Sequence, residues 1–244
     1  MKKEKIIRQQ AREALKGNFA VLIAGSLAVA AAVILLENVL YLIALPLGFY
    51  DLEADAVVPG KEAGMAVLMT GVIALAVALS PFVNGLLRAA GNAVTKGSCS
   101  VTDLFCFFQS PLRYFKTLAV NLGLGCLYAV LTTPLRIIGS LWFADGVFAV
   151  VWTVVTLCWS VFVFLLFLHY PLAAYALDDS HGALHYLFGY IGFSFRRFGA
   201  LLTLLLSMAG WLALGFFIVP LLYTVPYLLT ALMNSARWLF AMEN

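Results

Sequence analysis

Long apolar runs constrain this chain more than any other feature of its sequence. About 20 consecutive apolar residues span a bilayer, and five runs reach that length. The chain is 64% hydrophobic and 11% charged, whereas a soluble domain is about half apolar and about a quarter charged. We therefore expect an all-α membrane protein with about five transmembrane helices in one membrane domain, residues 19–219. The runs are Phe19–Phe49, Ala63–Leu87, Thr117–Phe143, Val147–Ala176 and Gly199–Val219.

Basic residues gather between alternate pairs of these runs. Residues 1–18, 88–116 and 177–198 hold twelve of the fifteen Lys and Arg residues, and the segments between them are acidic or short. Because cytoplasmic loops carry an excess of Lys and Arg, we expect a multi-pass protein of the bacterial cytoplasmic (inner) membrane with a cytoplasmic N-terminus. The first run exceeds the roughly 7–15-residue core of a signal peptide, so we expect it to remain as a span.

Residues 1–18 predict a basic amphipathic N-terminal helix. Ile7, Ala11 and Leu15 follow one helical face, and the basic residues lie elsewhere on the helix. Such a helix lies well on the lipid headgroups before the chain turns at Gly17-Asn18. A plain positively charged anchor for the first span is the alternative.

Apolar and aromatic residues at helical spacing predict two further amphipathic interfacial helices on the cytoplasmic side. The residues are Val101, Leu104, Phe105, Phe108 and Leu112 in one segment, and Leu184, Leu187, Phe188, Ile191 and Phe195 in the other. The two segments also resemble each other. Residues 81–122 and 164–205 align without gaps, so that Leu104-Phe105 meets Leu187-Phe188 and Arg113 meets Arg196. This pattern indicates a parallel hairpin repeat of the kind found in transporters, although apolar sequence also matches by chance.

Residues 220–244 do not have the uninterrupted apolar sequence that a membrane span requires. Pro220 and Pro226 interrupt the helical pattern, and an arginine such as Arg237 near a helix centre costs about 2.5–3.5 kcal/mol on insertion. We expect an amphipathic interfacial C-terminal helix on the external side. A sixth span that returns Arg237 to the cytoplasm is the alternative.

Glu37 and Arg136 are the unambiguous charges inside the predicted spans. At about 1.5 Å per residue, Glu37 lies about 27 Å above Phe19 and Arg136 about 28 Å above Thr117. Their similar depth makes them candidates for an intramembrane ion pair. The alternative is that each reaches the outer headgroups separately. For Asn84 and Asn121, near the inner ends of the second and third runs, we expect a hydrogen bond between helices.

Catalytic and metal-binding motifs are not found in the sequence. His181 and His185 are four residues apart beside Asp178 and Asp179, but without a third strong ligand this segment indicates a polar turn. The four cysteines form no CxxC pair, and the sequence has no nucleophile elbow, P-loop or dinucleotide fingerprint. We therefore expect no catalytic residue, no metal, no cofactor and no enzyme activity.

Two stretches resemble a known family. Residues 11–19 read AREALKGNF, and the chain closes with Tyr170 to Asp178, Ser194 to Gly199, Gly210-Trp211 and Pro226-Tyr227. Together they resemble an uncharacterised bacterial family of polytopic membrane proteins, known as domain of unknown function nine-seven-five. The usual Met-Lys-Gly before the last span is Phe195-Arg196-Arg197 here. The resemblance implies a bacterial membrane protein and no particular reaction.

The cytoplasmic cations suggest a function. Arg113, Lys116, Arg196 and Arg197 lie beside the predicted aromatic helices, as expected of a face that binds lipid headgroups or another membrane protein. Nucleic acid is not expected as a partner, because these cations already serve as topology signals. We expect a non-enzymatic protein that binds membrane lipids or a membrane partner. The alternative is a small-molecule transporter or channel built from repeated hairpins, which needs a polar cavity near the midplane.

Overall fold

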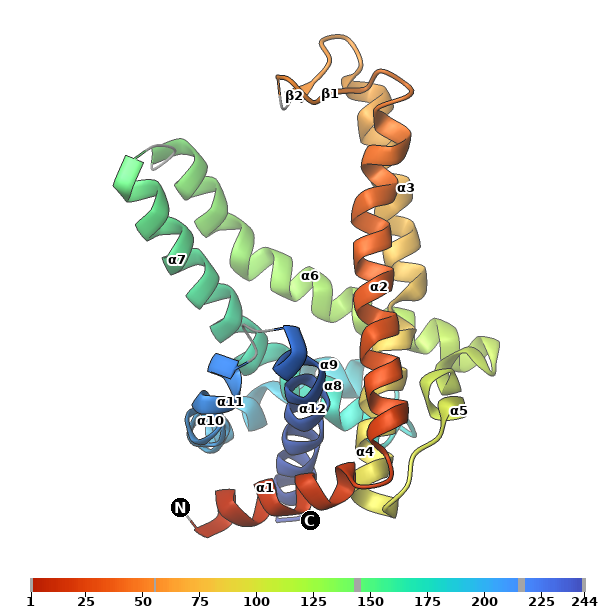
Figure 1. Ribbon diagram of the computed structural model, residues 1–244, viewed down its shortest axis with the longest axis vertical. Coiled ribbons are helices and arrows are strands. Elements are labelled where there is room, and N and C mark those ends of the chain that lie inside the picture. Colours follow the sequence, from red (N-terminus) through yellow and green to blue (C-terminus); the bar gives the residue numbers. More distant parts are fainter. Residues whose placement is uncertain (1, 55, 143–145, 215–217, 243–244) are drawn as a thin grey trace.

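The computed structural model describes residues 2–54, 56–142, 146–214 and 218–242, and the chain in these ranges is almost entirely helical (Figure 1). Four helices in these ranges are long and apolar enough to cross a membrane. They are Phe19–Ala44, Glu62–Lys96, Pro111–Gly139 and Gly146–Leu177. The chain is therefore an all-α membrane protein, as the sequence predicts.

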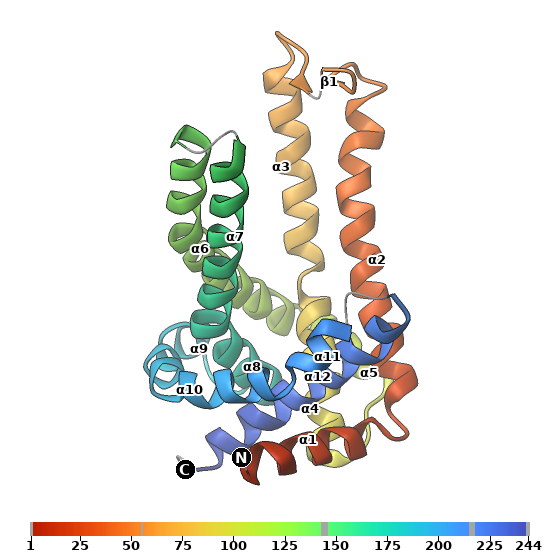
Figure 2. The same ribbon diagram turned by 60° about the vertical axis from the view of Figure 1, so that its left-hand side comes forward.

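Two helical hairpins rise from a common base (Figures 1 and 2). The first pairs α2 (Phe19–Ala44) with α3 (Glu62–Leu79), and its connection holds two short antiparallel strands. These are β1 (Tyr50–Asp51) and β2 (Ala56–Val57), with Tyr50 opposite Val57. The second hairpin pairs α6 (Pro111–Trp142) with α7 (Gly146–Val163) and leans away from the first.

Two of the spans continue into the base through a break in the helix. Between α3 and α4 (Pro81–Lys96), the break falls at Ser80 because Pro81 has no N–H to donate to the Val77 carbonyl, which accepts from the Ser80 N–H instead. Between α7 and α8 (His169–Leu177), the chain forms a π-helical turn, η2 (Phe164–Leu168). α4 packs closely against α8, because both helices present alanines such as Ala90 and Ala173 to the core.

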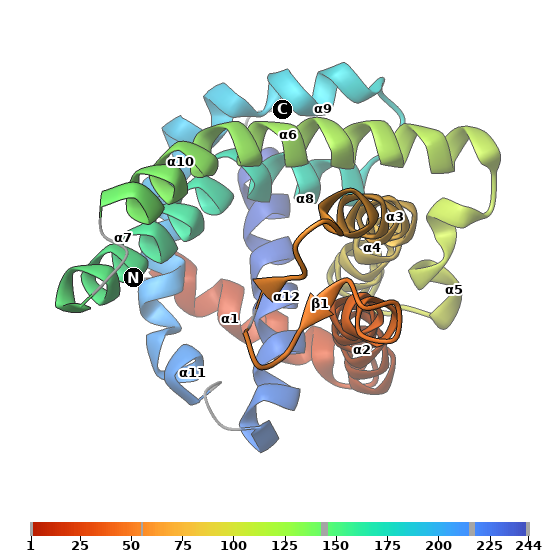
Figure 3. The same ribbon diagram turned by 90° about the horizontal axis from the view of Figure 1, so that it is seen from above.

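The other elements complete the base and surround α4 and α8. α12 runs through the middle of the base, and α1 lies beside it (Figure 3). The chain's two ends therefore lie on the same side of the molecule. The elements are α1 (Lys2–Leu15), α5 (Val101–Leu104), the 3₁₀ turn η1 (Cys106–Phe108), α9 (Ala183–Gly189), α10 (Ile191–Ser207), α11 (Ala209–Leu214) and α12 (Ile218–Phe240).

The predicted amphipathic N-terminal helix is confirmed, but its apolar face contacts protein. Ala11 and Leu15 are buried in the core of the base, while Lys5 and Lys16 are exposed. The turn after α1 is held by Asn18, whose amide nitrogen donates to the Gly97 carbonyl and whose amide oxygen accepts from the Cys99 N–H. The core therefore covers most of the apolar face of α1, and the side that faces outward is mainly charged, although Ile6 is 44% exposed.

The expectation of a fifth span over Gly199–Val219 is not met in the described residues, where four spans are found. α10 has 17 residues and ends at Ser207, and Met208 leaves the helical conformation before α11 begins. One face of α10, with Leu201 and Leu204, is buried within the base, while Leu202 and Leu206 on its other side are exposed. Part of this run is therefore apolar because it packs against protein, and composition alone does not distinguish such a helix from a span. Residues 215–217 of the run lie outside the described residues.

The C-terminal helix also differs from the expected external, interfacial one. Along α12, Tyr227 and Met233 are buried in the core of the base. The Asn234 amide donates to the Ile7 carbonyl of α1 at 3.1 Å, and the Arg237 guanidinium donates to the Val94 carbonyl of α4 at 3.0 Å. α12 is therefore a core element on the same side as α1. It is not among the candidate spans of the described chain, so the sixth-span alternative has no support either.

Candidate functional site

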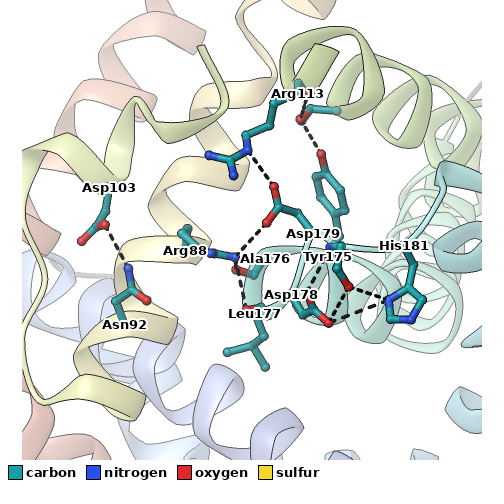
Figure 4. A network of polar contacts seen from close by, with 12 residues as sticks. Arg88, Asn92, Asp103, Arg113, Tyr175, Ala176, Leu177, Asp178, Asp179 and His181 are labelled. Carbon is teal, nitrogen blue, oxygen red and sulfur yellow. Dashed lines mark hydrogen bonds and ion pairs between the residues drawn. The ribbon is translucent and has the colours of Figure 1, made fainter. Parts of the chain in front are cut away.

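The two segments predicted as a repeat meet in the base through an ionic site. Asp179 follows α8, and its carboxylate lies 2.8 Å from the Arg113 Nε of α6 and 3.7 Å from an Arg88 nitrogen of α4 (Figure 4). The Lys116 ammonium donates to the Asp179 backbone carbonyl. We call Arg88, Arg113, Lys116 and Asp179 the Asp179 cluster. It holds three cations and one anion, and so carries a net positive charge.

Two cations of the Asp179 cluster, Arg88 and Lys116, also have a second kind of contact. Arg88 donates to the carbonyls of Ala176 and Leu177 at 2.9 and 3.2 Å, where the end of α8 leaves its carbonyls without helical partners. Lys116 lies 5.6 Å from the ring centre of Tyr175 and 5.7 Å from that of Tyr186, within the range of cation–π attraction. Cations at a helix C-terminus complement its dipole. The cluster therefore fixes the end of α8 against α4 and α6.

Neutral hydrogen bonds extend this junction toward the spans. The Asn84 amide of α4 donates to Asn121 of α6 at 2.8 Å, and the Asn121 amide donates to the Ser80 hydroxyl at 2.8 Å. The predicted hydrogen bond between Asn84 and Asn121 is thus confirmed. Beside the cluster, the Thr117 and Tyr175 hydroxyls lie 2.7 Å apart. These bonds satisfy polar groups that are expensive to leave unpaired near lipid.

For Cys106, Tyr186 and Asp178, the direction of the pKa shift favours the ordinary protonation state at neutral pH. Burial raises the pKa of the Cys106 thiol to about 11, and nearby arginines only partly oppose the shift. Burial also raises the pKa of Tyr186. For Asp178, burial acts to raise the pKa, but the hydrogen bonds from the Ser180 N–H and hydroxyl outweigh it and lower the pKa. A nucleophile or general base needs the opposite shifts, toward an active thiolate or a basic carboxylate.

The structure brings together two of the four predicted face cations. Arg113 and Lys116 belong to the Asp179 cluster, while Arg196 and Arg197 lie on α10. Arg113 remains 41% exposed although it pairs with Asp179. Sequence reasoning missed Arg88 and Asp179. A signal for Asp179 was present, because an acidic pair within a basic segment favours a local ionic contact.

The structure does not bring Glu37 and Arg136 together. Both side chains are exposed, and no ion pair between them is found within the described part of the chain. Glu37 lies on α2, and Arg136 lies on α6, whose hairpin diverges from that of α2 (Figures 1 and 3). Equal predicted depth was therefore insufficient, because the lateral separation of the hairpins also matters.

The structure places His181 and His185 in and beside a polar turn. Their rings stack with centroids 4.5 Å apart, and Asp178 accepts hydrogen bonds from Ser180 in a polar turn. In the ranges that the structure describes, no group of three or more His, Cys, Asp or Glu residues is placed to hold a metal ion. The interpretation of this segment as a polar turn agrees with the geometry.

Comparisons with known proteins add no assignment. A scan against protein-family models, a search of curated proteins and a search of solved structures each found no match to the chain. The resemblance of its two ends to a bacterial membrane family therefore stays a prediction.

Proposed function

We propose that this membrane protein binds anionic lipid headgroups and catalyses no reaction. The binding surface is the rim of the base, by which we mean the exposed residues around Arg113 and Arg196. The proposal includes a bacterial cytoplasmic membrane, a base that faces the cytoplasm, and membership of the family that the sequence resembles. Its main support is the combination of exposed apolar side chains and cations on that rim. Soluble surfaces rarely expose large contiguous apolar patches, whereas aromatic residues are enriched at the headgroup level of membranes.

The rim has two parts, one in each predicted repeat segment. Around Arg113, Leu112 is 82% exposed and Phe115 is 65% exposed. Around Arg196, Phe188 and Phe195 are likewise exposed. A lipid surface offers acyl chains to the apolar side chains and phosphates to the guanidinium groups. Each cation near an anionic leaflet contributes about 1 kcal/mol.

The test compares lipid retention by matched variants. The protein is reconstituted in nanodiscs of phosphatidylcholine and phosphatidylglycerol, and the lipids that remain after mild extraction are counted by native mass spectrometry. Arg196→Gln with Arg197→Gln should lower the phosphatidylglycerol preference several-fold, because two cations at about 1 kcal/mol each are removed. Lys61→Gln, at the far end of the first hairpin, should leave it unchanged. Equal preference in the rim variant and the wild type would sink the proposal.

A small-molecule transporter is the second candidate, and one feature favours it. A cavity of about 470 Å³ on the second hairpin is lined by Thr153, Thr156, Ser160 and Arg136, among others. However, the Thr153 and Thr156 hydroxyls donate to carbonyls of their own helix, Ala149 and Thr153, at 2.8 and 2.9 Å. Few polar groups are then left to recognise a solute. Uptake of a solute into proteoliposomes that depends on Thr156 would reverse this ranking.

A further inference from the structure

The groove between α6 and α7 has rigid walls. The indole N–H of Trp152 donates to the Leu135 carbonyl at 2.9 Å, and that of Trp159 donates to the Leu131 carbonyl at 2.8 Å. Gly139 allows the close approach of the helices, since a Cβ there would lie 2.2 Å from the Trp152 ring. These contacts join two membrane-spanning helices along one side and leave a preformed groove of about 470 Å³ beside them.

The groove changes character along its length. Arg136 lies at one end, six residues before α6 ends at Trp142, or about 9 Å from that end at the helical rise. Towards the base, the exposed side chains of the lining are apolar, with Leu157 62%, Val161 50% and Phe164 41% exposed, whereas Ser160 is 8% exposed and Tyr128 is half-buried. From Arg136 to Tyr128 the groove runs about 12 Å along α6. This length is close to the thickness of one hydrocarbon leaflet, which is about 15 Å.

Arg136 supplies the charge that a ligand must match. In the part of the chain that the structure describes, no acidic side chain pairs with it. A cation inside a span is costly unless it is paired or reaches the headgroup layer, and a guanidinium recognises phosphate through several N–H donors. An amphiphile with an anionic head and an apolar chain fits both ends of the groove, whereas a small polar solute fits only one.

We infer that the α6–α7 groove binds one phospholipid with an anionic headgroup, from the leaflet on the side away from the base. Its phosphate lies at Arg136, and one acyl chain runs along Leu157, Val161 and Phe164. This site is separate from the rim of the base and does not depend on it. The two sites together would contact both leaflets.

The experiment measures phosphatidylglycerol bound per protein by native mass spectrometry, after reconstitution with equal amounts of phosphatidylglycerol and phosphatidylcholine. Each variant is also made together with Arg196→Gln and Arg197→Gln, so that the rim of the base contributes little to the retained lipid. In this background, Arg136→Gln should lower the ratio of retained phosphatidylglycerol to phosphatidylcholine at least five-fold, and Arg136→Lys should keep most of it. Val161→Trp should displace both lipids by filling the groove without changing any charge. Lys61→Gln is the matched control for a cation on the same side outside the groove, and should behave as wild type.

Several results would overturn the inference. One is an unchanged ratio in Arg136→Gln while the protein keeps its wild-type melting temperature. Another is wild-type lipid retention in Val161→Trp. If glycerol 3-phosphate competes with the lipid at equal affinity, the site serves a soluble anion instead. A loss confined to the Arg196 and Arg197 variants would leave only the rim of the base as a lipid site.

Discussion

The two segments that resemble each other in sequence have the same order of elements but different tertiary roles. Residues 81–122 contain α4, the connector α5–η1 and the start of α6, and residues 164–205 contain η2–α8, the connector α9 and most of α10. In the first segment the last helix continues for 32 residues and crosses the bilayer, whereas α10 has 17 residues and stays in the base. A shared local pattern therefore does not dictate whether a helix crosses the membrane.

The ionic contacts differ in the same way. Arg113 of the first segment pairs with Asp179, while the aligned Arg196 lies on α10 and is not part of the Asp179 cluster. The residue that aligns with Asp179 in the first segment is Lys96, so the second segment alone supplies the acid. Within the Asp179 cluster the two segments are therefore complementary, because the first supplies the cations and the second supplies the anion.

The largest expected loss of stability comes from the α5–η1 connector of the first segment, which packs closely on α4 at Gly85. A Cβ on Gly85 would lie 1.9 Å from the Leu104 backbone carbonyl oxygen, which cannot move aside cheaply. The aligned residue in the second segment is Leu168, whose large side chain packs in a core cluster with Tyr186 of α9. Gly85→Ala should lower the free energy of unfolding by about 3 kcal/mol or more, measured by tryptophan fluorescence in detergent. Gly125→Ala, where a Cβ meets open space, is the control, and equal stability of both variants would contradict the packing.

Removing the shared acid should have the next largest effect. Asp179→Asn leaves Arg113 and Arg88 without their anionic partner, and we expect a loss of about 2 kcal/mol for this partly exposed group. Asp178→Asn, whose side chain is 63% exposed, should change stability little. A double-mutant cycle with Arg113→Gln measures the coupling. Fully additive losses would show that the ion pair does not join the segments.

The smallest expected effect is a difference in thiol alkylation rate between the α5–η1 connector, which holds Cys106, and the α9 connector. With the pKa of Cys106 raised to about 11 by burial, about one thiol in a thousand is ionised at pH 8, against about one in four for an ordinary cysteine. The Cys106 thiolate is more basic and therefore more nucleophilic, which restores about ten-fold of the alkylation rate that the low ionised fraction removes. Alkylation of Cys106 should therefore be roughly twenty-fold slower than that of Gly189→Cys, the aligned exposed position.

The pH profile checks the same prediction. Both variants are prepared with the other cysteines replaced by serine, and alkylation is followed by mass spectrometry. Because burial raises the pKa, the Cys106 rate should keep rising with pH towards about 11, whereas the Gly189→Cys rate should level off near about 8.5. Identical profiles at the two positions would show that the connectors are equally exposed.

Several elements could be predicted because their signals are local. The amphipathic face of Ala11 and Leu15 and the turn at Asn18 are properties of neighbouring residues, and the structure confirms both. The contact of Asn84 with Asn121 was also predictable, since polar groups at matching depth in adjacent spans lower their free energy by forming a hydrogen bond with each other. The partners of Arg113 were not, because Asp179 lies 66 positions away in the sequence and no spacing rule connects them.

Apolar run length was sufficient to predict the helical membrane class and four of the spans, because burial in lipid demands about 20 apolar residues whatever the neighbours. The tertiary structure decided the rest. It places the apolar face of α10 against protein, carries α12 into the core beside α1, and separates Glu37 from Arg136. The physical reason is that lipid and a protein core are both apolar. A hydrophobic residue is compatible with either, and only the packing of distant elements determines which one it meets.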